Sequence, residues 1–345
     1  MLSPESWVLR NRTQHAGLGT VVVEVKMTLV LREGDVKSLM DMGDAVKWVE
    51  DGLRALGEGK ARNVPRQRVK MPKGTLHVLP GADFEQGVVG LKCYTTFREG
   101  TRFLVTLFSS ESGKLLSLME ADYLGMMRTG AASGVATKYM ALSDADVLAL
   151  FGTGWQARGQ LLAIAAAKPI KRVQVYGRDA ARRGKFADEL SKLAGVEVVP
   201  VDSVAAALDG AKIVTTVTSA RQPLFASDAV QPGTHINAVG SNGLLRQELD
   251  EELVRRASIV AVDSRQQSKV ESGDLLIPTE RGWIDWDQLP ELGEIVAGRQ
   301  PGRRDASDIT IFESHGLGLE DVTVAARVYQ RAKERGIGQE IELLP

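Results

Sequence analysis

The apolar residues in the second half of the chain occur in short, unbroken runs. The run from Val147 to Phe151 contains no polar position, which is typical of a strand buried on both faces of a parallel sheet. The same pattern predicts strands at 172–176, 196–201, 213–217, 235–239 and 259–262. Helices are predicted between them at 158–167, 179–193, 204–208 and 248–256. This alternation predicts right-handed crossovers, so we expect a Rossmann-type, doubly wound α/β domain over residues 143–310.

The first half of the chain has a different pattern. A strand is predicted at 29–31, and a helical spacing over 34–57 is interrupted near Gly43. Strand-like stretches then follow at 66–71, 75–79, 87–96, 102–109 and 114–119, separated by glycine-containing junctions such as Gly81-Ala82. These junctions predict an antiparallel meander and therefore an α+β domain. A long helix at 121–142 leads into the second domain.

The two ends of the chain are assigned separately. A helix is predicted at 320–335 and ends at Gly336, after an irregular stretch at 283–292. Because this last helix could return to the first domain, we group 311–345 with 27–142. Residues 1–26 form an N-terminal extension, whose valine run at 21–25 is compatible with an edge strand, a tail or upstream sequence. We assign it no role.

Composition restricts the partners and the compartment. A length of 345 residues favours two domains, and a formal net charge of −1 creates no strong field for nucleic acid or a membrane surface. The one cysteine, Cys93, excludes an internal disulfide and agrees with a reducing compartment, so we expect a cytoplasmic protein. No run is long enough to span a membrane, no signal peptide is evident, and the four histidines have no metal-ligand spacing.

A glycine turn follows the first strand of the α/β domain. Gly152, Gly154 and Ala157 form a G-x-G-x-x-A pattern between a buried strand and a helix. In this context the backbone N–H groups and the helix dipole can bind a pyrophosphate, whereas a plain glycine turn would have no such role. The sequence therefore predicts a dinucleotide site.

The end of the second strand of this domain predicts which dinucleotide binds. Sites selective for NAD place an acid there, but residues 175–178 read Val-Tyr-Gly-Arg. Arg178, with Arg182 or Arg183, could bind a 2′-phosphate, while Asp179 would reach the ribose only if the turn were shifted by one residue. We therefore expect NADP(H) rather than NAD(H), with NAD(H) as the alternative.

Four basic residues are candidates for holding an anionic substrate. Arg66 and Arg68 alternate along one strand and so share a face, and Arg128 lies on the helix that leads into the cofactor domain. A planar guanidinium binds a carboxylate bidentately. Lys92 interrupts an apolar strand, where burial and nearby cations would lower its pKa and suit it to proton exchange. The alternatives are exposed arginines and a lysine whose ammonium reaches solvent.

Several motifs together carry a resemblance to a known family. Residues 127–134 read Met-Arg-Thr-Gly-Ala-Ala-Ser-Gly and precede the glycine turn at 152–157. Further matching segments are Gly90-Leu91-Lys92, His235-Ile236-Asn237-Ala238-Val239-Gly240, Val262-Asp263-Ser264, Glu271-Ser272-Gly273-Asp274, Ser314-His315-Gly316 and Leu319-Glu320-Asp321. From about Met27 to the C-terminal helix, the chain resembles the ornithine cyclodeaminase/mu-crystallin family.

The resemblance implies a homodimer built through the first domain, an NAD(H) or NADP(H) site, and chemistry on amino acids or their imines. It assigns the substrate carboxylate to Arg128 and to Arg68 in preference to Arg66, and it assigns Lys92 to the carboxylate or the imine. It places cofactor contacts at Thr129, Ser133, Gly152, Gly154, Trp155, Gln156, Ala157, Arg178, Thr218, Val239, Gly240, Ser241, His315 and Gly316. Members of the family include cyclodeaminases, alanine dehydrogenases, ketimine reductases and opine-type dehydrogenases.

One position separates the reactions of the family. Cyclodeaminases have an aspartate after the strand that matches 235–239, where this chain has Asn242. An amide cannot take a proton at neutral pH or offset an ammonium charge. We therefore expect an NAD(P)H-dependent reductase of α-imino acids, which runs in reverse as an amino-acid dehydrogenase. Its substrate would be a small, dicarboxylic or cyclic imino acid. The alternatives are an ornithine or lysine cyclodeaminase and a ligand-binding protein of the mu-crystallin kind.

Overall fold

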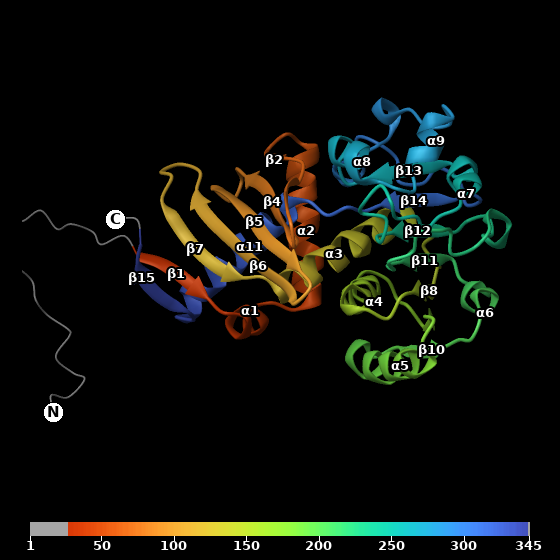
Figure 1. Ribbon diagram of the computed structural model, residues 1–345, viewed down its shortest axis with the longest axis horizontal. Coiled ribbons are helices and arrows are strands. Elements are labelled where there is room, and N and C mark those ends of the chain that lie inside the picture. Colours follow the sequence, from red (N-terminus) through yellow and green to blue (C-terminus); the bar gives the residue numbers. More distant parts are fainter. Residues whose placement is uncertain (1–26, 344–345) are drawn as a thin grey trace, which may run out of the picture.

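The computed structural model describes residues 27–343, which form two domains side by side (Figure 1). The valine run at 21–25 lies outside the described residues. The long helix α3 (Asp122–Met140) leads from the first domain into the second, and the segment that ends in helix α11 (Gly318–Arg335) returns. No helix in the described part of the chain is long and apolar enough to cross a membrane.

The first domain is a mixed eight-stranded sheet with helices on one face. Its strands are β1 (Met27–Leu31), β2 (Ala61–Asn63), β3 (Gln67–Met71), β4 (Gly74–Asp83), β5 (Val88–Phe97), β6 (Gly100–Ser109), β7 (Leu115–Glu120) and β15 (Gln339–Glu342). Strands β4 to β7 form the predicted antiparallel meander within the order β15-β1-β7-β6-β5-β4-β2, and β3 pairs with β4. Helix α11 packs on β4, β5 and β6, beside the helices α1 (Glu33–Leu39) and α2 (Met42–Gly57).

The second domain is the predicted doubly wound parallel sheet. Its order is β10-β9-β8-β11-β12-β14-β13, so the strand order reverses beside β8. The strands are β8 (Val147–Phe151), β9 (Arg172–Tyr176), β10 (Glu197–Pro200), β11 (Ile213–Thr216), β12 (His235–Ala238), β13 (Ile259–Val262) and β14 (Thr310–Glu313). The helices are α4 (Trp155–Ala167), α5 (Ala180–Ala194), α6 (Val204–Leu208), α7 (Glu251–Arg256), α8 (Arg265–Glu271), α9 (Leu276–Glu280) and α10 (Leu292–Val296), with short 3₁₀ turns at Ser227–Ala229 and Trp286–Gln288.

One hydrophobic cluster spans both domains. Apolar side chains of α2, α3 and α11 pack with Ala163 of α4, Phe312 of β14 and the apolar face of α10. Helices α3 and α4 cross where glycines bring their backbones together. Because interdigitated cores are dense and transmit strain, this junction holds the two domains in a defined relative position.

Three expectations differ from the structure. Gly81-Ala82 is not a turn, because β4 continues to Asp83; a Cβ at Gly81 would lie 2.6 Å from the Leu319 backbone, so this glycine allows α11 to approach the sheet. The proposed boundary at residue 310 falls at the start of β14, whose four residues lie inside the parallel sheet. Glu248 precedes its predicted helix, which begins at Glu251.

Two helical glycines provide a matched test of the junction. A Cβ at Gly130 would lie 2.2 Å from the carbonyl oxygen of Gly159, so G130A should lower the free energy of unfolding by about 1–3 kcal/mol through overpacking. Gly184, on α5, has no atom within 4 Å of the same position, so G184A should raise it by about 0.5–1 kcal/mol. Denaturant unfolding of both variants is the measurement, and changes of the same sign would contradict the packing described here.

Candidate active site

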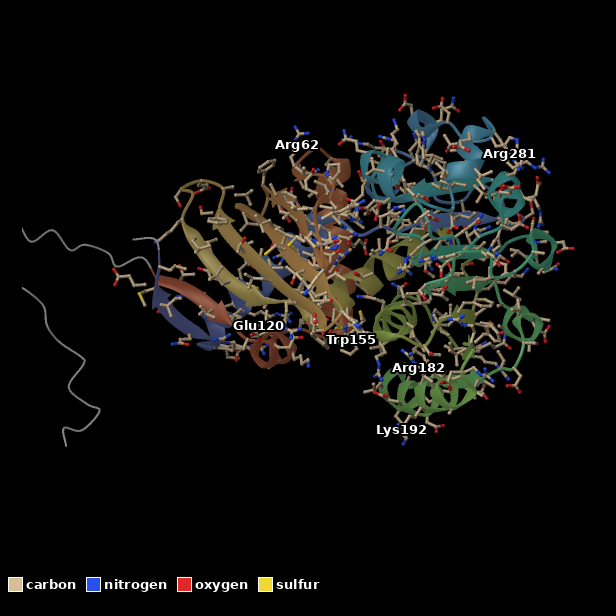
Figure 2. The ribbon with its side chains drawn as sticks, viewed as in Figure 1. Arg62, Glu120, Trp155, Arg182, Lys192 and Arg281 are labelled. Carbon is tan, nitrogen blue, oxygen red and sulfur yellow. The ribbon has the colours of Figure 1, made fainter. Side chains whose placement is uncertain are left out.

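A cavity of about 980 Å³ lies where the carboxyl ends of the parallel strands face the first domain. Residues that follow β8, β9, β11, β12 and β14 form one side of it, and β5, β6 and α3 form the other. The reversal of strand order between β8 and β11 creates this crevice, which is where open α/β sheets bind ligands. Figure 2 shows Trp155, the first residue of α4, on the side of the second domain that faces the first.

The glycine turn forms the floor of the cavity beside β8. Gly152 has φ +124°, and a Cβ there would lie 2.6 Å from the carbonyl oxygen of Val217, so only glycine fits. Gly154 is the N-cap of α4, has no capping side chain, and has open space where its Cβ would be. The first N–H groups of a thirteen-residue helix therefore lack a side-chain acceptor beside the cavity. This arrangement fits the pyrophosphate of a dinucleotide.

The end of β9 forms the adjoining wall. Arg178, Asp179 and Arg182 line the cavity here. Asp179 is the N-cap of α5, and its Oδ1 accepts a hydrogen bond of 3.0 Å from the backbone N–H of Arg182. The Nε of Arg182 donates to the carbonyl oxygen of Thr153 at 3.2 Å. The carboxylate is thus engaged in capping, and Arg178 makes no ion pair within the described residues.

Two buried cations occupy the opposite end of the cavity, and they share a carboxylate. Lys92 Nζ lies 3.1 Å from Asp321 Oδ1, and Arg128 Nε lies 3.0 Å from the same oxygen. Arg128 Nη1 also donates to Glu320 Oε2 at 2.9 Å. Strand β5, helix α3 and the first turn of α11 each supply one side of this network. Gly316, at φ +81°, leaves room for the guanidinium, since a Cβ would lie 2.4 Å from Arg128 Nη1.

Burial changes the proton affinity of this end of the cavity. It lowers the pKa of Lys92 to about 8, an effect that Asp321 opposes and Arg128 reinforces. Burial also raises the pKa of Glu320 to about 7, against the influence of Arg128. The pKa values of a lysine and a carboxyl group therefore both lie near neutral pH within one hydrogen-bonded network, as acid–base chemistry requires.

Of the two neighbouring arginines, the structure places Arg66, one residue before β3, on the cavity wall. Arg66 lines the cavity and donates from Nη2 to the carbonyl oxygen of His315. Arg68 is not part of the wall, and its Nη1 pairs with Glu271 Oε1 at 2.5 Å. Both side chains reach Glu271, so they do share a face. Alternation along a strand gives the face of a side chain but not which of two neighbours reaches the cavity.

Most of the other expected site residues lie on the wall. These are Thr129, Gly152, Gly154, Trp155, Gln156, Arg178, Thr218, Val239, Gly240, Asn242, His315 and Gly316. Three expected cofactor contacts do not. Ser133 and Ala157 are fully buried in α3 and α4, and the hydroxyl of Ser241 donates to Glu313 behind the wall. The structure therefore places these three side chains behind the wall and not on it.

The sequence reasoning missed a group of buried carboxyls beneath the wall. Glu248 accepts hydrogen bonds from the N–H groups of Thr218 and Gly240, at 2.6 and 2.7 Å. Asp274 accepts from the N–H groups of Glu248 and Leu249, and Glu313 accepts from the hydroxyls of Ser241 and Ser272. These carboxyls hold the loops that form the wall. The Glu-Ser-Gly-Asp motif at 271–274 was the available signal.

A second missed feature is an aromatic stretch of wall beside Lys92. Tyr94, Thr96, Thr101 and Phe103 line the cavity from β5 and β6. Positions 92, 94 and 96 follow the period-two spacing of a strand, so this face could have been predicted once Lys92 had been placed in the site.

Glu313 offers a test of the buried carboxyl group. Burial, together with Asp274, raises the pKa of Glu313 well above its usual value. The folded state therefore holds a proton that the unfolded state releases, and stability falls as pH rises from about 4.5 toward neutrality. E313Q keeps the shape of the side chain but does not titrate. In denaturant unfolding, its free energy of unfolding should therefore fall less between pH 5 and pH 7.5 than that of the wild type.

A neighbouring substitution supplies the contrast. D321N leaves two buried cations without the carboxylate that they share, and it should lower the free energy of unfolding by about 3–5 kcal/mol at pH 7. A comparable loss in E313Q at pH 7 would show that Glu313 is ionised in the folded protein.

Comparisons with known proteins agree with this geometry. A Delta(1)-pyrroline-2-carboxylate reductase of Bacillus cereus is 33% identical over 326 residues, which cover 91% of this chain and 99% of that protein. The structure of Thermococcus litoralis Delta(1)-pyrroline-2-carboxylate reductase in complex with NADH and L-proline matches with a TM-score of 0.86 and 35% identity, over 91% of this chain and 100% of that one. An archaeal alanine dehydrogenase, described as a dimer with bound NAD, matches with a TM-score of 0.85 and 31% identity, over 92% and 100%.

The sequence pattern of the ornithine cyclodeaminase/mu-crystallin family matches residues 26–336, which is most of the chain. The protein therefore belongs to the ornithine cyclodeaminase/mu-crystallin family.

Proposed function

We propose that the protein is an NAD(P)H-dependent reductase of α-imino acids, which runs in reverse as an amino-acid dehydrogenase. The observation that carries the proposal is the placement of Arg66, Lys92 and Arg128 at the end of the cavity opposite the dinucleotide turn. These cations suit the carboxylate of an imino acid. The B. cereus and T. litoralis relatives, which are reductases of a cyclic imine carboxylate by name, support the same reaction class.

The side chains of this chain have distinct tasks in that reaction. The nicotinamide, when bound, supplies the hydride that reduces the imine carbon. Arg128 uses Nε and Nη1 for Asp321 and Glu320, which fixes its guanidinium plane while Nη2 stays available for the substrate carboxylate. Arg66 is held by the carbonyl oxygen of His315 and supplies a second donor. Lys92 Nζ neutralises the carboxylate or passes a proton to the imine nitrogen, for which a pKa of about 8 is suited.

The residues of the second domain bind the cofactor in this proposal. Gly152, Gly154 and the first turn of α4 bind the pyrophosphate, and Thr218, Val239 and Gly240 approach the nicotinamide half. We favour NADP(H) over NAD(H), because Arg178 is free to bind a 2′-phosphate while Asp179 is engaged in capping α5. The NADH and NAD named for the two solved relatives belong to those proteins.

We also propose a homodimer through the uncovered face of the first sheet. Cross-strand partners on this face include Val78, Cys93 and Leu104, and Val89 lies opposite Phe108 farther along the same face. These side chains are only partly buried in the single chain, and Val89 is 39% exposed. A contiguous apolar sheet face is typical of a protein interface. Sedimentation of the protein as a monomer at micromolar concentration would refute the dimer.

The single cysteine supports a cytoplasmic location.

Turnover separates this proposal from its two alternatives. Purified protein with NADPH should reduce Delta(1)-pyrroline-2-carboxylate, or the imines formed from 2-oxo acids and methylamine. A pure ligand-binding protein would give no turnover. A cyclodeaminase would convert L-ornithine with NAD into proline and ammonia, which we expect to be very weak, because Asn242 lines the cavity where a carboxylate would be needed. Robust proline formation would favour the cyclodeaminase over the reductase.

The pH dependence tests the role of Lys92. If the ammonium form is required, kcat/KM should fall as pH rises through about 8, since the lysine then loses its proton. D321N should move this fall to lower pH, because Asp321 raises the pKa of Lys92. K92M should lower kcat/KM by about 100-fold or more. The matched control is K269M, which removes an exposed lysine outside the cavity wall. An unchanged pH profile in D321N would exclude Lys92 as the titrating group.

Arg178 tests the cofactor preference. R178A should raise KM for NADPH by about tenfold or more and leave KM for NADH nearly unchanged, since a charged hydrogen bond to phosphate contributes about 1.5–3 kcal/mol. The control is R172A, an exposed arginine at the start of β9 and far from its carboxyl end. A wild-type preference for NADH, or equal effects of R178A on both cofactors, would contradict the NADP(H) assignment.

A further inference from the structure

A row of three rings crosses the first sheet beside Lys92. His77 on β4, Tyr94 on β5 and Phe103 on β6 are direct cross-strand neighbours. The rings of His77 and Tyr94 stack with centroids 4.3 Å apart and planes 4° apart, and Phe103 lies 5.0 Å from Tyr94. The plane of Phe103 is tilted by 37° from that of Tyr94, and both rings form part of the cavity wall, so the row presents a preformed aromatic surface to a ligand.

This aromatic surface lies next to the cationic end of the cavity. Lys92 precedes Tyr94 by two residues on the same face of β5, and its Nζ lies 5.0 Å from the centroid of Phe103 and 5.8 Å from that of Tyr94. A molecule whose carboxylate binds Lys92 and Arg128 therefore has the two rings within reach of its next carbon atoms.

Beyond the three rings, the cavity wall continues with uncharged residues toward an end that is open to solvent. The next cross-strand pair is Thr96 with Thr101, and both threonines line the cavity. Thr96 is exposed, so this end of the cavity opens to solvent. His77, behind the wall, contacts the Thr96 hydroxyl at 3.3 Å. Burial, with Arg68 and Arg66, lowers the pKa of His77 to about 4, so its ring is neutral at physiological pH.

We propose that Tyr94 and Phe103 form the subsite for the side chain of the substrate, and that it selects uncharged alkyl chains or the ring of a cyclic imine. The inference rests on the proposed reductase function and adds its substrate class. The threonine pair leaves the subsite open, so chains longer than a methyl group extend along it without steric conflict. A distal ammonium would meet no carboxylate here, and a distal carboxylate would lose water against aromatic rings.

The test compares substrates that differ only in the side chain. Imines are formed from methylamine with pyruvate, 2-oxopentanoate or oxaloacetate, and kcat/KM is measured for the wild type, F103A and Y94A. In the wild type the propyl side chain should be preferred over methyl by about tenfold, since each buried methylene is expected to contribute about three- to fourfold. F103A and Y94A should remove most of this preference, because they should lower kcat/KM more for the 2-oxopentanoate-derived imine than for the pyruvate-derived imine.

Conservative variants distinguish two roles for Tyr94 and Phe103: direct contact with the substrate and positioning of Lys92. F103L and Y94F keep an apolar wall and should keep the preference for the longer chain. If the rings served only to position Lys92, the alanine variants would lower kcat/KM equally for all three substrates and would shift the alkaline limb of the pH profile. Either that result or a wild-type preference for the oxaloacetate-derived imine would overturn the subsite. Absence of turnover by the wild type with every imine would overturn the proposed function itself, and the subsite with it.

Discussion

The shared carboxylate of Asp321 is the interaction on which this site depends. One oxygen accepts from Lys92 on β5 and from Arg128 on α3, so the first turn of α11 fixes two cations that come from distant parts of the chain. Buried ion pairs of this kind contribute little to stability, because desolvation offsets their attraction. Their value here is positional. The carboxylates lie behind the cations, and the cavity in front of them is left for an anion that the protein does not supply.

The same arrangement explains why the two domains must be held rigidly. Arg128 approaches the cavity from the helix that also crosses α4, and the N-terminus of α4 forms the dinucleotide turn. A displacement of α3 on α4 would therefore change the distance between the carboxylate-binding end and the cofactor-binding end. Small changes in the distance between reacting groups are costly in rate. Glycines at the helix crossing, where no Cβ would fit, keep the separation short and defined.

The limits of prediction from sequence have identifiable causes. The parallel sheet could be predicted because doubly buried strands produce unbroken apolar runs such as that of β8. Strand β14 was missed because it has only four residues, two of them the polar Thr310 and Glu313, although it is an interior strand that lies between β12 and β13. Gly81 suggested a turn because a glycine needed for close approach looks the same in sequence as one needed for a bend. Choosing between Arg66 and Arg68 required the position of the His315 carbonyl oxygen, which accepts a hydrogen bond from Arg66, lies 249 residues away in the chain and is known only from the fold.

The charge distribution of the cavity wall favours anionic ligands. Seven of the described residues that line the cavity are basic, Arg66, Lys92, Arg128, Arg178, Arg182, Arg221 and Arg246, whereas one is acidic, Asp179. The acidic side chain caps α5 and lies at the cofactor end. A cavity with this field concentrates anions, which suits both the phosphates of a dinucleotide and the carboxylate of an imino acid. It opposes any substrate that brings a second positive charge. In the proposed function, the asparagine at 242 and the neutral aromatic row act in the same direction, toward reduction of imines with uncharged side chains.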